Sequence, residues 1–424
     1  MNDTPTSDFA AYIGIDWADR KHDVCVQAAG VTKPQHRVIA HTPEAIDAWA
    51  CELRERFEGK PIAVCLELTK GPLVSALQRY DFFVLFPVNP RALAKYRQSW
   101  SPSGKKDDHS DALLILDVLL KHPERLKALR PQSAQMRALQ QLVEDRRKLV
   151  HDRVRVTNRI TAALKAYFPQ PLDWFEDKGT AIFCDFLERW PTAELARSAR
   201  RPVLESFFHS HNVRNAERIE QRIAAIKQAV ALTDDIGVVL AAKLRVVTLV
   251  SELRVLISAI AEYDVEIAQL CERLADYKIF ASLPGAAEVF APRLLAAFGE
   301  DRERFGSAAE LQRYAGLAPV TEASGNSRWV HWRWACTSFV RQSFVEWVAQ
   351  TIPRSFWAGA FYQQQKAKGA SHQAALRALA FKWARILYRC WVERTPYDES
   401  RYLKALQKRR SSLLHSAASA ATSA

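Results

Sequence analysis

One long stretch of the chain, from Val238 to Leu283, contains neither Gly nor Pro. Apolar residues recur there in alternating steps of four and three residues, which is a heptad pattern. The pattern predicts a long helix, within a helical region of about 213–277, that lays one apolar seam on a partner helix. We expect a helical hairpin or a coiled coil, used as an oligomer interface. The seam comprises Leu249, Leu253, Leu256, Ile260, Tyr263, Ile267, Leu270 and Leu274.

In the amino-terminal segment, the apolar residues occur in short runs and not in a long helical pattern. Short apolar runs between polar turns predict strands at 12–15, 24–28, 36–40, 62–66 and 82–88. Helical spacing predicts helices over 43–57, with Thr42 as the N-cap, and over 71–80. This alternation is typical of an α/β domain.

The rest of the chain is predicted to be mainly helical, with a mixed segment over 169–212 and a low-complexity end, SSLLHSAASAATSA. The expected fold class is therefore α/β plus all-α. We expect four regions: an α/β domain over 10–132, a basic helix and coiled-coil region with an insertion over 133–277, a helix-rich domain over 278–398 and a disordered tail over 399–424.

The charge of the chain is strongly basic and unevenly distributed. Lys and Arg number 60 against 47 Asp and Glu, which gives a net charge of +13. Residues 125–170 alone hold eleven Lys and Arg against three acids. This balance favours a polyanionic partner, either a nucleic acid or an anionic membrane surface. The clustered cations are expected to contact phosphates without reading sequence; they are Arg146, Arg147, Lys148, Arg153, Arg155 and Arg159.

Other features bound the cellular setting. The seven cysteines are scattered and form no CxxC pair, which favours buried, reduced thiols over a zinc ribbon or a disulfide scaffold. No apolar run reaches the length of a membrane helix, and the first residues do not resemble a signal peptide. We therefore expect a cytoplasmic protein that does not bind a membrane.

Four carboxylates occur at positions where they could meet. Asp16 and Glu67 follow predicted strands, and Asp108 and Asp111 lie one turn apart at the start of a predicted helix. Each alone is more typical of a turn or a helix cap. Together they match a ribonuclease-H-like layout, which could hold Mg²⁺ or, alternatively, Mn²⁺. Asp107 and His109 could assist or replace them.

Two carboxyl-terminal segments are further candidates. Ser324 precedes Gly325 in a polar loop, and an aromatic and basic run with Arg328 and Arg333 follows. Such a run can stack bases and pair with phosphates, or it can form the edge of a tryptophan-rich core. Residues 282–300 could form a helix-hairpin-helix or an ordinary turn between helices.

The order of these blocks is distinctive: GIDWADRKHD, LELTKG, VNPRALAKYRQS, GKKDDHSDA, then the heptad helix, SLPG and GLAPVTEASG. The chain resembles the DEDD-type insertion-sequence transposases, which are relatives of Piv-type DNA invertases, over roughly residues 10–398. An actin-like ATPase also begins with IGID, but it needs glycine-rich phosphate loops that this sequence lacks.

The resemblance implies an RNase H/RuvC-like amino-terminal domain, long coiled-coil helices and a helix-rich carboxyl-terminal transposase domain. It implies a Mg²⁺-binding set of Asp16, Glu67, Asp108 and Asp111, and Ser324 as the nucleophile. It also implies double-stranded DNA, at element ends and target, as the substrate, a homodimer or homotetramer, and in some members a bridge RNA as guide. The alternatives are a RuvC-like junction nuclease in which water attacks, and a non-catalytic nucleic-acid-binding protein.

Overall fold

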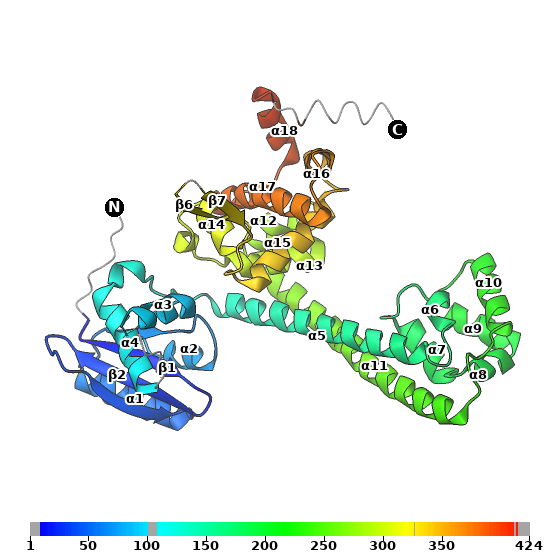
Figure 1. Cartoon of the computed structure of the whole chain (residues 1–424), viewed down its shortest axis with the longest axis horizontal. Coiled ribbons are helices and arrows are strands. Elements are labelled where there is room, and N and C mark those ends of the chain that lie inside the picture. Colours follow the sequence, from blue (N-terminus) through cyan, green and yellow to red (C-terminus); the bar gives the residue numbers. More distant parts are fainter. Residues whose placement is uncertain (1–8, 101–107, 326, 411–412, 414–424) are drawn as a thin grey trace. The chain divides into compact units, whose positions relative to one another are not determined.

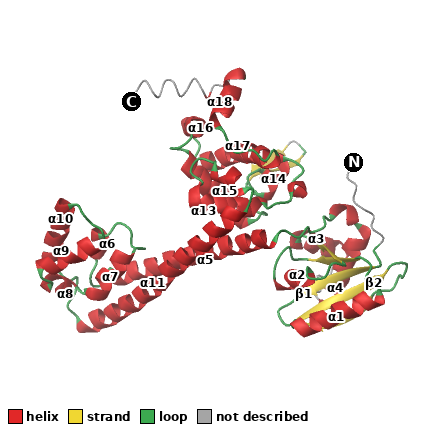
Figure 2. Ribbon diagram, turned by 180° about the vertical axis from the view of Figure 1, so that it is seen from behind, coloured by secondary structure: helices red, strands yellow, loops and turns green. Residues whose placement is uncertain are grey.

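The computed structural model describes residues 9–100, 108–325, 327–410 and 413. The chain divides after Pro131 into two compact units (Figures 1 and 2). The first unit is mixed α/β and the second is helical apart from one hairpin.

The first unit is built on a five-stranded mixed sheet with the order β3-β2-β1-β4-β5. The hairpin partners β1, β2 and β3 are antiparallel, whereas β1, β4 and β5 are parallel. The predicted strands are thereby confirmed. Their bounds are β1 Ala11–Trp17, β2 Lys21–Ala28, β3 Gln35–Ala40, β4 Ile62–Leu66 and β5 Phe83–Pro87.

Helices cover both faces of this sheet. On one face, α1 and α2 pack on the apolar side chains of β1, such as Ile13 and Ile15. On the other face, α4 packs on Cys25 of β2, and α3 and α4 pack on Cys65 of β4. Successive side chains of each strand point to opposite faces of the sheet, so they contribute to two separate hydrophobic cores. The helices are α1 Pro43–Arg56, α2 Pro72–Leu77, α3 Pro90–Trp100 and α4 Asp108–Lys121, followed by a 3₁₀ turn, Pro123–Arg125.

Two long helices, α5 (Ala134–Leu164) and α11 (Ile236–Arg273), form the arm of the second unit. They run antiparallel, because the start of α5 shares a core with the end of α11, and the end of α5 shares another with the start of α11 (Figure 1). Every residue of the predicted heptad seam is buried or half-buried. The seam residues therefore pack within the chain.

The helical region predicted over 213–277 is interrupted. It forms α10 (Ala216–Lys227) and α11, separated by residues 228–235. Asp235 caps α11, because its carboxylate accepts a hydrogen bond of 2.8 Å from the Gly237 amide. The apolar residues of the sequence continue through 228–235, so their pattern does not indicate where one helix ends and the next begins.

The lobe, residues 171–227, connects the two helices at one end of the arm. Its short helices share a hydrophobic core with α5 and α11 that is rich in aromatic rings, including Phe186 and Phe208. Besides α10, they are α6 Pro171–Trp174, α7 Ala181–Arg189, α8 Ala193–Ser198 and α9 Arg201–Ser210.

The carboxyl-terminal domain, residues 277–408, has four fully buried tryptophans in its core. Each indole nitrogen donates a hydrogen bond: Trp347 to Pro284 O, Trp357 to Tyr397 Oη, Trp383 to Thr351 Oγ1 and Trp391 to Gly299 O, at 2.8–3.1 Å. Polar groups in this core are thus satisfied. The elements are α12 Tyr277–Ala281, α13 Ala287–Phe298, a 3₁₀ turn Arg302–Arg304, α14 Ala308–Tyr314, β6 Val320–Ser324, β7 Ser327–His331, α15 Ser338–Thr351, α16 Phe356–Ala367, α17 His372–Val392 and α18 Glu399–Lys408.

Part of the segment expected to be a disordered tail is ordered. Residues 399–408 form α18, whose first turn is capped by Asp398, and Leu406 is buried in the domain core. Leu403 and Leu406 lie three residues apart, and that spacing gives the helix an apolar side. Within the described residues, no helix is long and apolar enough to cross a membrane.

Candidate active site

A glycine in the central strand allows α4 to cross the sheet closely. A Cβ at Gly14 would lie 2.5 Å from the backbone nitrogen and 2.9 Å from the Cα of Leu116, and closer still to the carbonyl oxygen of Ala112. Only glycine fits such an approach without moving the helix. Tyr12 packs beside Leu116 and Leu120, so α4 runs antiparallel to β1. The first turn of α4 therefore lies toward the carboxyl end of β1.

Asp16 and Glu67 lie at that same edge of the sheet. Asp16 is two residues beyond Gly14 and so points to the face that α4 covers. The last parallel pair between β1 and β4 joins Ile15 to Leu66, and Glu67 is the next residue of the chain. Both carboxylates are half-buried and make interactions within the protein.

Asp111 is almost fully buried on α4, with 3% of its surface exposed. Its Oδ1 lies 2.8 Å from Nη2 of Arg97, a residue of α3. Asp108 begins α4, but its side chain and that of His109 lie outside the described residues, as does Asp107. Among the side chains that the structure describes, no group of three His, Cys, Asp or Glu is arranged to hold a metal.

Asp23 and its partner His36 are further residues of this edge that the sequence pattern did not single out. Asp23 lies directly across the β1–β2 hairpin from Asp16 and is 5% exposed. Nε2 of His36 lies 2.9 Å from its Oδ1. The signal was present in the sequence, because a tight turn at 18–20 brings residues 16 and 23 opposite each other. A second carboxylate therefore adjoins Asp16 on the α4 face.

The cysteines of this face are packing residues. Burial raises the pKa of the Cys25 thiol to about 11 and that of the Cys65 thiol to about 12. Both remain neutral thiols at physiological pH. All seven cysteines are free, as expected, although Cys51 is exposed.

Ser324 is the last residue of β6, rather than part of an irregular loop. It pairs with Ser327 at the tip of the β6–β7 hairpin, and both residues are exposed. Gly325 follows with a positive φ of 55°. At the base of the hairpin, Nε of Arg333 donates a hydrogen bond of 3.2 Å to the Ala318 carbonyl. The hydroxyl is thus presented to solvent on an anchored hairpin.

The aromatic and basic run is partly exposed and partly half-buried. Arg328 is exposed on β7, and Trp329 and Trp334 are 60% and 71% exposed. Trp332 instead holds the guanidinium groups of Arg341 and Arg377 over its ring, at 5.5 and 4.5 Å. Of the two predicted phosphate contacts here, Arg333 already has a backbone partner.

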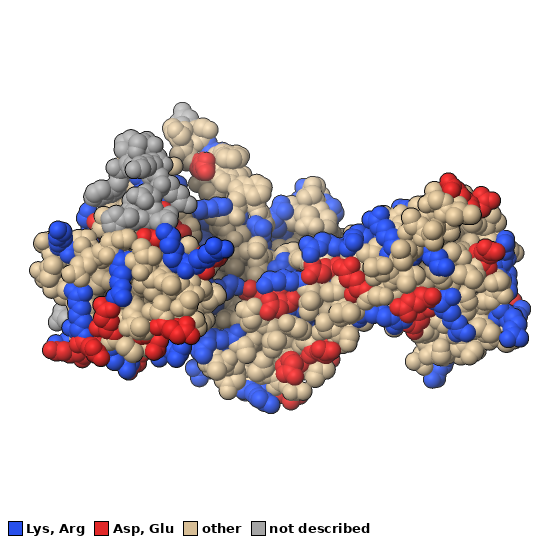
Figure 3. All heavy atoms as spheres, turned by 90° about the horizontal axis from the view of Figure 1, so that it is seen from below, with Lys and Arg blue, Asp and Glu red and all other residues tan. Residues whose placement is uncertain are grey.

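Four of the six predicted cations of α5 form ion pairs along the arm. Arg146 pairs with Asp264, Lys148 with Asp145, Arg155 with Asp152 and Arg159 with Glu252. Blue and red side chains accordingly lie beside one another in Figure 3. Exposed surface pairs contribute little stability, so they can exchange for phosphates.

The turn at Pro284 and Gly285 packs on a helix of its own domain. Gly285 has a positive φ of 70°, and a Cβ there would lie 2.8 Å from atoms of Gln350 in α15. Trp347 hydrogen-bonds to Pro284. Of the two interpretations of 282–300, this packing favours the ordinary turn between helices.

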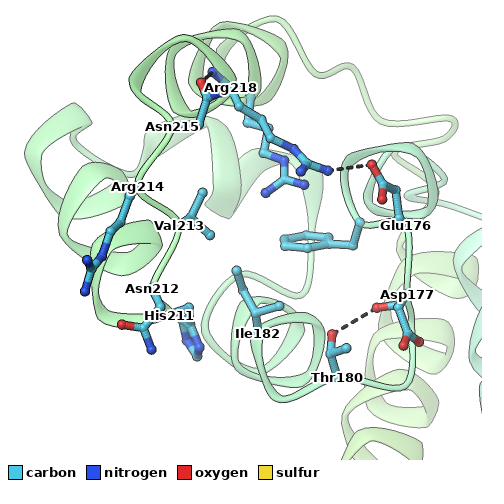
Figure 4. Close-up of a pocket in the computed structure, with 12 residues that line it drawn as sticks. Glu176, Asp177, Thr180, Ile182, His211, Asn212, Val213, Arg214, Asn215 and Arg218 are labelled. Atoms are coloured by element: carbon cyan, nitrogen blue, oxygen red, sulfur yellow. Dashed lines mark hydrogen bonds and ion pairs between the residues drawn. The ribbon is translucent and has the colours of Figure 1, made fainter.

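The lobe carries an open pocket of about 410 Å³ (Figure 4). Ile182 and Val213 face its centre, Phe175 also lines it, and Glu176 pairs with Arg218 at 2.5 Å. Burial, assisted by repulsion from Arg218, lowers the pKa of Arg222, which also lines the pocket.

Comparison with known proteins places these features in a class. A family model described as "Transposase" matches residues 13–169, and a second, described as "Transposase IS116/IS110/IS902 family", matches residues 277–363. The acids at the edge of the sheet and Ser324 both lie within matched segments, and the lobe lies between these segments. The class is that of transposases, the enzymes that move insertion elements.

The relatives are consistent along nearly the whole chain. "Mini-circle putative transposase for IS117" from Streptomyces coelicolor is 29% identical over 92% of this chain and 96% of its own length. "Insertion element IS116 uncharacterized 44.8 kDa protein" from Streptomyces clavuligerus is 26% identical over 89% and 93%. The two family models and these relatives agree, so the chain is similar along most of its length to the DEDD-type insertion-sequence transposases of elements such as IS110 and IS116.

Proposed function

We propose that the protein is a recombinase that cuts and rejoins the DNA of an insertion sequence, with RuvC-like carboxylates in one unit and a serine nucleophile in the other. The observation that carries this proposal is the common edge of Asp16 and Glu67, with α4 drawn over it by Gly14. The sheet order is that expected of an RNase H-like domain.

Asp16, Glu67, Asp108 and Asp111 are the residues proposed to hold Mg²⁺ or Mn²⁺. Their oxygens are the hard ligands these ions prefer. A bound cation would stabilise the negative charge that develops on phosphate oxygens during strand exchange. Asp111 must then share its carboxylate with Arg97 or leave that ion pair, whose N–O distance is 2.8 Å. Asp23 adds negative charge beside Asp16 and would favour cation binding.

Ser324 is the proposed nucleophile. Its Oγ forms a bond to phosphorus while the bond from phosphorus to one deoxyribose oxygen breaks. The serine proton is lost, and the released deoxyribose oxygen takes up a proton. The phosphoserine ester retains the energy of the broken bond, so a second DNA end can displace the serine.

The partners proposed are double-stranded DNA, at element ends and target, and a bridge RNA that guides the choice of site. Exposed cations of α5 and Arg328 would contact the backbone. We also propose a cytoplasmic homodimer or homotetramer. Since the heptad seam is filled by α5, the exposed apolar residues of α11, such as Leu240, Leu244 and Val255, are better placed for self-association.

The decisive experiment is trapping of a covalent adduct. Full-length protein is incubated with element-end DNA and Mg²⁺, with and without co-purified RNA, and is analysed after denaturation. We expect a protein–DNA adduct that Ser324→Ala abolishes and that Ser327→Ala, the matched neighbour on the same hairpin, preserves. Strand cleavage that survives Ser324→Ala would instead support a junction nuclease that uses water.

Metal dependence has its own control. Asp16→Asn is expected to abolish the adduct, whereas Asp19→Asn, in the exposed hairpin turn, leaves it intact. DNA binding without any Mg²⁺-dependent cleavage would reduce the protein to a non-catalytic binder. Mixing Ser324→Ala with Asp16→Ala protein tests whether subunits share a site, because recovered activity requires each to supply its intact half.

A further inference from the structure

A cavity of about 250 Å³ lies where the arm meets the carboxyl-terminal domain. Helices α5, α11, α13 and α15 contribute to its wall. We call it the junction pocket, and Arg147, Arg293 and Glu346 are the residues that define its chemistry.

Arg293 is a buried cation with an unused donor. Only 8% of its surface is exposed. Nε donates to Ser343 Oγ at 3.2 Å and Nη1 to Glu346 at 2.7 Å. Its Nη2 is buried and, among the described residues, has no hydrogen-bond partner. A buried charged donor without an acceptor is unfavourable, so a ligand that accepts from it would be stabilised.

Arg147 brings a second positive charge from α5. It is half-buried, and its Nε is also buried without an acceptor in the described part of the chain. Burial, together with the charge of Arg293, lowers the pKa of Arg147, while Glu346 and Glu144 oppose the shift. The two guanidinium groups are thus close enough to repel each other.

Three carboxylates line the pocket, but within the described residues none of them forms an ion pair with Arg147. Glu346 already accepts from Arg293, and Asp264 is paired with Arg146. Glu288 at the rim is exposed to solvent. An anion in the junction pocket, which both guanidinium groups line, would relieve the repulsion between them.

We propose that the junction pocket binds a phosphate group of a nucleic-acid backbone. Planar guanidinium forks match phosphate oxygens and are the usual choice where an anion is held by more than one bond. Free inorganic phosphate has the same chemistry. The backbone is the favoured source, because Arg155 and Arg159 continue along α5 with their side chains exposed.

A phosphate bound in the junction pocket would contact both α5 and α15, and α15 is the helix that follows the Ser324 hairpin. α15 supplies both Ser343 and Glu346, and its Arg341 lies over Trp332, directly after β7. Phosphate binding at the junction pocket does not depend on the proposed function. A link between phosphate binding and the position of Ser324 does rest on the proposed function.

The test compares phosphate and oligonucleotide binding in full-length variants. Binding of inorganic phosphate is measured by calorimetry, and binding of a duplex oligonucleotide as a function of salt. Arg147→Gln should weaken phosphate binding at least about tenfold. It should also reduce the salt slope, which is the slope of the logarithm of the oligonucleotide binding constant against the logarithm of the salt concentration, by about one. Glu346→Gln should strengthen phosphate binding, because it removes the competing acceptor. Arg254→Gln, an arm arginine held by Asp185 and Glu188, is the matched control and should change neither.

Each outcome decides one part of the proposal. Equal phosphate affinity in the wild type, Arg147→Gln and Glu346→Gln proteins overturns the site. A lost phosphate response with an unchanged oligonucleotide salt slope overturns the backbone as the source and leaves the free anion. Neither readout requires strand cleavage, so a failed adduct experiment leaves this result interpretable.

Discussion

Substitution of Gly14 by alanine tests how the acids are brought together. The new Cβ would lie 2.5 Å from the Leu116 nitrogen, whereas ordinary contacts begin near 3.5 Å, so α4 must retreat by about 1 Å. The obstructing atoms are backbone and cannot rotate away. Overpacking of this kind lowers the free energy of unfolding by about 3 kcal/mol. Alanine also restricts the unfolded chain more than glycine does, which raises the free energy of unfolding by up to about 1 kcal/mol. We expect a net loss of about 2 kcal/mol in the free energy of unfolding.

The assay is urea unfolding combined with amide hydrogen exchange. Gly30→Ala is the control, because Gly30 has a positive φ of 76° but nothing within 4 Å of a Cβ. Both variants should lose stability, but only Gly14→Ala should accelerate exchange along α4. A Gly14→Ala protein within about 0.5 kcal/mol of the wild type, with α4 protection intact, would refute the close approach.

Two further predictions concern stability. Arg254→Gln should lower the free energy of unfolding by about 1 kcal/mol, because Arg254 joins α11 to Asp185 and Glu188 of α7; an unchanged urea midpoint would contradict this. Burial, assisted by the charge of His41, lowers the pKa of His22 from 6.5 to about 4. The folded state thus resists protonation of His22, so stability should fall as pH drops from about 6.5 to about 4. His22→Gln should show a shallower fall in the same urea titrations, and equal slopes would count against this assignment.

The strands and the acid positions at their ends could be predicted because they depend on local pattern. Asp16 and Glu67 terminate apolar runs, and neighbouring parallel strands end at one edge. The ion pair of Asp111 with Arg97 could not be predicted, since it depends on how α3 packs beside α4. Asp23 was within reach, because hairpin register follows from turn length.

The second unit shows what periodicity leaves open. A heptad pattern specifies that a partner helix exists, but it does not specify which chain supplies it. The Ser324 hairpin was also signalled by a Gly-Asn pair between segments able to form strands, a combination typical of a two-residue turn. The junction pocket had no local signal, because Arg147 and Arg293 are far apart in sequence and meet only through packing.

The filled seam between α5 and α11 has a consequence for how copies of this chain can assemble. Met136 and Leu139 of α5 belong to one hydrophobic core of the second unit, and Val156 and Ile160 to the other. Exchanging α11 for the same helix of another copy would therefore require both cores to open before they re-form. Substitutions in the filled seam such as Ile260→Ala should therefore lower the stability of the arm without changing the number of subunits in the assembly.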